Sequence, residues 1–114
     1  GRLTNAIELM RQVVIGYEAR LGAGHDGLLK PTTDFGQMLV RASEFAEAEP
    51  LLRKAYDGYR IRAAQRSSAS RAKARDDATE RLVQLYEAWG KPDQAAEWKR
   101  KLAAVEKAAP PPPR

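Results

Sequence analysis

The chain has 114 residues, a net charge of +5, and 43% hydrophobic and 31% charged residues, which is typical of one small soluble helical domain and excludes a disordered chain. Cysteine is absent, which excludes a disulfide framework and a thiolate metal site. No apolar run approaches the roughly 18 residues that span a bilayer, and no signal-peptide core opens the sequence, so we expect a cytoplasmic protein without a membrane partner.

The first predicted element is an amphipathic helix over 3–21. Thr4 or Asn5 is predicted to cap its start, and Gly22 is predicted to end it with a positive φ. The glycine-rich residues 22–31 are predicted to form a connection. The helix is predicted because its apolar residues recur every three or four positions, at Leu3, Ile7, Met10, Val13, Val14, Tyr17 and Leu21.

A helical hairpin is predicted next, over 32–66. Thr32 or Thr33 would cap the start of its first helix, and residues 43–44 would form the turn. Pro50 falls near the first turn of the second helix, where the loss of an N–H costs least.

A second hairpin is predicted over 70–107. A Gly-Lys-Pro turn at 90–92 separates its two helices, because glycine ends one helix and proline can open the next. Residues 108–114 contain four successive prolines and are predicted to form a disordered, polyproline-like tail. No segment alternates with a period of two for long enough to form a strand. The sequence therefore predicts an all-α fold, with five helices in a domain over 1–107.

An internal repeat relates the first helix to the third. Residues 6–20 align without a gap with residues 48–62, at an offset of 42, and share Ala, Leu, Arg, Gly, Tyr and Arg at corresponding positions. A period between about 20 and 50 residues is the signature of stacked-repeat architectures. Such folds supply extended surfaces, so a binding surface is expected in preference to an active site.

The first hairpin resembles the tetratricopeptide repeat. Gly36 stands where that family's signature places a helix glycine, and Leu39 stands in the aromatic position three residues later. Ala48 and Leu52 stand where it places a small residue on the second helix and a large apolar residue four positions later. The resemblance implies an α-solenoid of antiparallel hairpins, in which small residues let neighbouring backbones approach.

The last hairpin resembles a degenerate unit of the same family. Tyr86 occupies the aromatic position and Ala95 the small position, whereas Val83 replaces the helix glycine and Lys99 replaces the large apolar residue. A charged residue there is expected in a terminal unit, whose outer face meets water.

The start of the chain suggests a fragment. Residues 1–3 align with the turn at 43–45 at the same offset, and no initiator Met is present. We therefore expect the C-terminal piece of a larger protein, cut within a repeat. Leu21-Gly22 followed by His25 resembles the junction of the longer, kinesin-light-chain-like repeats. Similar repeats end some bacterial multidomain proteins, including serine/threonine kinases.

The resemblance implies a non-catalytic scaffold for a protein or peptide partner. Gln37 and Gln84 would bond a peptide backbone, and Arg41 would take a carboxylate. The Lys and Asn residues that grip a C-terminal carboxylate in chaperone-binding relatives have no counterpart, so capture of chaperone tails is predicted to be absent. In this family the first helix of each hairpin lines the concave groove, which here selects Thr33, Gln37, Val40, Arg41, Glu80, Gln84 and Glu87.

Two other functions are compatible with the sequence. The chain could be the regulatory tail of a bacterial serine/threonine kinase, or a basic helical surface could bind nucleic acid. The second alternative depends on a run of cations without an intervening acid, formed by Arg60, Arg62, Arg66, Arg71, Lys73 and Arg75. Such runs are more often solvated faces, so nucleic acid is the less favoured partner.

The remaining candidate sites favour structural roles, and neither a metal, a cofactor nor a catalytic set is predicted. His25 is the only histidine, too few ligands for a metal site. The acids Asp76, Asp77 and Glu80 are interpreted as first-turn residues that answer the helix macrodipole. The glycines at 22–27 follow no predicted strand and make no phosphate cradle.

Two further clusters have an ordinary structural interpretation. Trp89 and Trp98 could stack on a ligand, but packing in a small core is the better interpretation. Ser67, Ser68 and Ser70 lie near arginines and could be phosphorylated, although the same residues make an ordinary loop.

Overall fold

The computed structural model describes residues 2–22, 26–65 and 68–108, with side chains as far as residue 104. These residues contain five α-helices and no strand, so the predicted all-α class is confirmed. The helices are α1 (Arg2–Leu21), α2 (Leu29–Arg41), α3 (Phe45–Gln65), α4 (Ala69–Ala88) and α5 (Pro92–Ala108), with a short 3₁₀-helix η1 (Asp26–Leu28) before α2.

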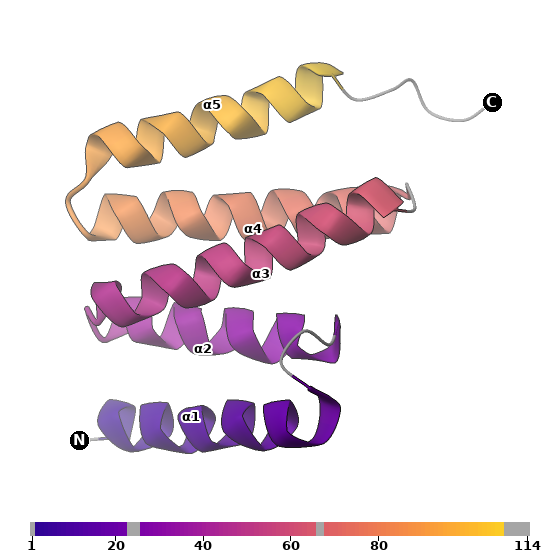
Figure 1. Ribbon diagram of the computed structural model, residues 1–114. Coiled ribbons are helices and arrows are strands. Elements are labelled where there is room, and N and C mark those ends of the chain that lie inside the picture. Colours follow the sequence, from indigo (N-terminus) through magenta and orange to yellow (C-terminus); the bar gives the residue numbers. More distant parts are fainter. Residues whose placement is uncertain (1, 23–25, 66–67, 109–114) are drawn as a thin grey trace.

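The helices follow one another across an elongated molecule (Figure 1) with extents of 51 × 36 × 18 Å. Each helix packs mainly against the helices before and after it, and α2 also contacts α4. When the residue numbers of α1 are increased by the repeat offset of 42, they nearly coincide with those of α3. The two repeated segments therefore form corresponding helices.

Helix α2 begins earlier than predicted. Thr32 and Thr33 lie inside the helix and do not cap it, and the Thr33 hydroxyl donates to the Leu29 carbonyl at 2.8 Å. The physical reason is burial, because Leu28 and Leu29 are 3% and 9% exposed and the helix starts without a side-chain cap. Residues 26–31 of the predicted connection are therefore helical, in η1 and the start of α2.

Two other predicted details at helix starts were wrong. Thr4 and Asn5 lie inside α1, which already begins at Arg2, so neither is its cap. Pro50 lies one full turn inside α3, because that helix begins at Phe45.

The turns between helices use left-handed backbone. Gly22 has a φ of +90°, as predicted, and its N–H donates to the Glu18 carbonyl at 2.8 Å. Gly90 has a φ of +76° after α4. At the α2–α3 turn the left-handed residue is Ser43, with a φ of +61°, where an L-residue is strained.

The core lies where the helices cross. Gly36 is buried, and a Cβ there would lie 2.6 Å from Leu52 Cδ2. Ala48 on α3 is fully buried. The small residues that suggested close crossings thus face the interior. The core also contains large side chains from every helix, including Ile7, Val14, Phe35, Leu39, Leu82, Leu85, Tyr86 and Trp98.

The two outer helices differ in the faces they turn to solvent. On α1, Leu9 is 65% exposed and Ile15 is 58% exposed. On α5, the exposed residues include the charged Glu97 and Arg100. Helix α5 thus has a polar outer face, whereas α1 leaves apolar surface uncovered.

Candidate functional site

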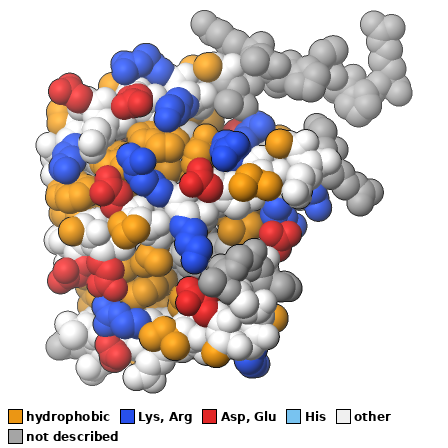
Figure 2. All heavy atoms as spheres, in the orientation of Figure 1, with side chains coloured by type: hydrophobic (Ala, Val, Ile, Leu, Met, Phe, Trp, Pro, Cys, Tyr) orange, Lys and Arg blue, Asp and Glu red, His pale blue; other side chains and the backbone are white. Residues whose placement is uncertain are grey.

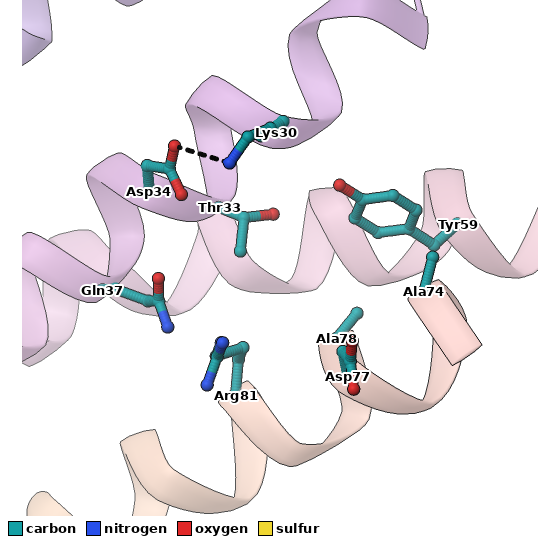
Figure 3. Close-up of a pocket in the computed structure, with 9 residues that line it drawn as sticks. All are labelled: Lys30, Thr33, Asp34, Gln37, Tyr59, Ala74, Asp77, Ala78 and Arg81. Atoms are coloured by element: carbon teal, nitrogen blue, oxygen red, sulfur yellow. Dashed lines mark ion pairs between the residues drawn. The ribbon is translucent and has the colours of Figure 1, made fainter. Parts of the chain in front are cut away.

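Two adjoining hollows form a groove between α2 and α4. Each has a volume of about 220 Å³, and both are lined by Gln37 and Arg81. Figure 3 shows the first hollow, with α2 and α4 as its walls and Tyr59 of α3 among its lining. Leu52 of α3 lines the second hollow. We call this feature the α2–α4 groove.

Five of the seven side chains expected on the groove line it. Glu80 and Glu87 lie outside, both exposed on α4. Glu80 precedes Arg81, and consecutive helical residues point about 100° apart. Glu87 instead meets Lys99 of α5 at 3.1 Å. The five that line the groove are Thr33, Gln37, Val40, Arg41 and Gln84.

Arg81 lines both hollows and is absent from the set that the sequence predicted. Its guanidinium and the Gln37 amide point toward one another from opposite walls (Figure 3). In the amide orientation that satisfies both groups, Gln37 Oε1 accepts from three nitrogens of Arg81: Nε, Nη1 at 3.2 Å and Nη2 at 3.3 Å. Arg81 lies three residues before Gln84, so the helical period contained the signal.

The groove is uneven in charge. In the first hollow, Asp34 lies 3.6 Å from Lys30, and Asp77 lies 3.0 Å from Lys73. The second hollow is lined by Arg41 and Arg81 and by no acid. Among the described residues, neither arginine has a carboxylate within 4.0 Å. The second hollow is therefore the cationic end.

The basic run of the sequence is interleaved with acids in the fold, and Figure 2 shows cations and anions intermixed on the visible face. Arg66 lies outside the described residues. Arg71 donates to the Arg62 carbonyl at 3.0 Å. The other four cations each have an acid within 4.0 Å, in the pairs Arg60–Asp57, Arg62–Asp26, Lys73–Asp77 and Arg75–Asp76.

The acidic residues near the start of α4 do not lie where they would interact favourably with its macrodipole. The helix begins at Ala69, so Asp76, Asp77 and Glu80 all lie beyond the first turn, where the dipole has little effect. The first-turn interpretation was wrong, because even Asp76, the first of the three acids, lies seven residues after Ala69. The described residues contain no group of three or more His, Asp or Glu side chains that could hold a metal ion.

The serine cluster includes a helix cap. Ser68 is the N-cap of α4, and its hydroxyl accepts from the Arg71 backbone N–H at 3.1 Å. Ser70 lies exposed in the first turn. Ser67, His25 and residues 109–114 lie outside the described residues. The tail was predicted to begin at Ala108, which is instead the last residue of α5.

The two tryptophans pack in separate aromatic groups. Trp98 is 5% exposed and meets Tyr56 edge-on, with ring centroids 4.8 Å apart. Trp89 stacks on Phe45 at 5.8 Å and on Tyr86 at 6.3 Å. The predicted core packing is confirmed, and the indoles do not form a ligand-stacking pair.

A polar bridge joins α3 to α4, and its three residues line neither hollow of the groove. The Tyr86 hydroxyl donates to Glu49 Oε2 at 2.7 Å and accepts from Arg53 Nε at 3.1 Å. Burial and the bond to the Glu49 carboxylate raise the pKa of Tyr86. The bridge therefore satisfies the one polar atom of a fully buried ring.

Comparison of the chain with protein-family models, with curated proteins and with solved structures gave no match. The tetratricopeptide resemblance therefore depends on residues of this chain alone. Within the described part of the chain, no helix combines the length and the apolarity needed to cross a bilayer.

Proposed function

We propose that the chain is a non-catalytic interaction module that binds an extended peptide segment in the α2–α4 groove. One observation carries the proposal: polar and apolar side chains from two helices distant in sequence line two adjoining hollows, with α3 residues among them. Amides such as Gln37 and Gln84 can both donate to and accept from a peptide backbone.

The arrangement of the helices supports a repeat scaffold of the tetratricopeptide type. Gly36 and Ala48 are buried, and α2 and α4, the first helices of consecutive hairpins, are in contact. In stacked-repeat proteins, each unit buries its apolar face against the next. The exposed apolar side chains of α1 are where a further unit would stack.

The size of the groove sets the length of the ligand. The α4 residues that line it run from Ala74 to Gln84, about 15 Å at the rise of an α-helix. An extended chain covers this length with about five residues. Octapeptides are therefore long enough to fill it.

The proposal is tested by selecting octapeptides from a random display library on the immobilised chain. Ala74→Trp would place an indole in the first hollow, which Ala74 lines. Ala104→Trp is the matched control, because Ala104 is exposed on α5. We expect the selected peptides to lose at least tenfold in affinity for Ala74→Trp and to keep their affinity for Ala104→Trp, with both variants folded by circular dichroism.

Failure of the selection, or equal binding by both variants, would contradict a peptide groove. Nucleic acid is the alternative, and the interleaved acids along the basic run weigh against it. Binding of a generic oligonucleotide that falls steeply with added salt would favour that alternative.

A further inference from the structure

The strongest unexplained feature of the groove is its cationic end. Arg41 and Arg81 line the second hollow together with Gln37, Val40, Leu52 and Gln84. No acid lies among these residues, and the two acids that line the first hollow, Asp34 and Asp77, have lysine partners.

We propose that the second hollow is a carboxylate subsite, in which Arg41 and Arg81 together hold an acidic group of the bound segment. The inference rests on the proposed peptide-binding function. It adds that this end of the groove prefers bound segments that carry a carboxylate.

The geometry prepares Arg81 for this role. The bond to Gln37 on the opposite wall directs the guanidinium across the groove. A guanidinium has five N–H donors in a planar fork that matches a carboxylate. One amide oxygen accepts only part of that capacity, so Arg81 retains donors for a ligand.

The apolar lining of the hollow strengthens such a pair. Leu52 is 2% exposed, and Val40 is half-buried. Apolar walls lower the local dielectric constant and limit competition from water beside Arg81, which is half-buried, so its ion pair is expected to be stronger than that of Arg41, which is exposed.

The acidic group could be an Asp or Glu side chain or a peptide C-terminus, and four fluorescent octapeptides separate these sources. All are built of Gly, Ser and Leu. Three have an amidated C-terminus and one central Glu, Gln or Lys. The fourth has the central Gln and a free C-terminal carboxylate. Affinity is measured by anisotropy, and the side-chain amide signals of Gln37 and Gln84 are followed by NMR.

We expect the Glu peptide or the free-carboxylate peptide to bind at least tenfold more tightly than the amidated Gln peptide, and the Lys peptide to bind most weakly. The favoured peptide should shift the Gln37 and Gln84 amide signals. Its advantage should disappear in Arg81→Gln and in Arg41→Gln. Arg100→Gln is the matched control, because it removes the same charge from the exposed face of α5, and it should keep the full advantage.

Equal affinity for all four peptides, with shifted Gln37 and Gln84 signals, would overturn the carboxylate subsite and leave the peptide groove standing. The same loss in Arg100→Gln as in Arg81→Gln would also overturn it, because a general effect of net charge would then explain the preference. The carboxylate subsite would also be overturned if no peptide at millimolar concentration shifted the Gln37 and Gln84 amide signals. The library selection with Ala74→Trp tests independently whether the groove binds peptides at all.

Discussion

Leu52 of α3 occupies the space that Gly36 of α2 leaves empty. A Cβ at Gly36 would lie 2.6 Å from Leu52 Cδ2 and 2.8 Å from Leu52 Cγ. Both residues are buried, so neither can move into solvent. This contact lets α2 and α3 approach closely, and it places Leu52 among the residues that line the second hollow.

Gly36→Ala should be less stable than the same change at an open helix position. Overpacking a buried site costs about 1–3 kcal/mol, which offsets or exceeds the roughly 1 kcal/mol that Ala gains over Gly in a helix. Gly16→Ala is the matched control, because it lies in α1 with no atom within 4 Å of its added Cβ. Urea denaturation should show Gly16→Ala to be stabilised relative to Gly36→Ala. Equal stabilisation of both variants would contradict the close crossing.

Leu52→Ala should lower the free energy of unfolding by about 2–5 kcal/mol, because it leaves a cavity at a side chain that is 2% exposed. Leu9→Ala makes the same chemical change at a side chain that is 65% exposed. It should change stability by less than about 0.5 kcal/mol. Chemical denaturation measures the free energy of unfolding of both variants. A decrease below about 0.5 kcal/mol for Leu52→Ala would show that α2 and α3 are packed differently.

Ser43→Gly should stabilise the chain by about 0.5–1 kcal/mol, because glycine adopts the left-handed backbone without a Cβ penalty. Ser43 has a φ of +61° at the α2–α3 turn. Ser43→Val should be destabilised, since a β-branched side chain tolerates that backbone poorly. Thermal unfolding of the two variants gives the order, and the reverse order would mean that the turn has another conformation.

Tyr86→Phe should cost about 1–2 kcal/mol at neutral pH, because it removes a hydrogen bond to the Glu49 carboxylate. Tyr17→Phe, on the exposed side of α1, should have little effect. Equilibrium denaturation in urea compares the two. A neutral result for Tyr86→Phe would show that water replaces the hydroxyl without loss.

The same tyrosine should make stability fall at alkaline pH. Burial and the Glu49 carboxylate raise the pKa of Tyr86 above its ordinary value of 10.0. The unfolded chain therefore loses this proton first, so the contribution is complete below pH 10.0 and is lost as the pH rises through the folded pKa. Urea denaturation between pH 9 and pH 11 should show a smaller decline for Tyr86→Phe than for the parent chain. Parallel declines would contradict a shifted Tyr86.

The sequence by itself determined the helical class and most helix ends. Apolar residues at every third or fourth position predicted the helices, and Gly22 and Gly90 marked two of the turns, because these signals depend on local backbone chemistry. The repeat and the small residues also indicated that Gly36 and Ala48 face the interior. Local signals failed at α2, where the burial of Leu28 and Leu29 replaced the cap expected at Thr32 or Thr33.

Only the tertiary structure decided how charges are distributed. The run of cations from Arg60 to Arg75 contains no acid in sequence, yet the fold places Asp26 beside Arg62, from a segment far away in the chain. In the same way, Arg81 and Arg41 line one hollow because α2 and α4 lie side by side. Such neighbours depend on the crossing of whole helices, which is fixed by packing between side chains distant in sequence.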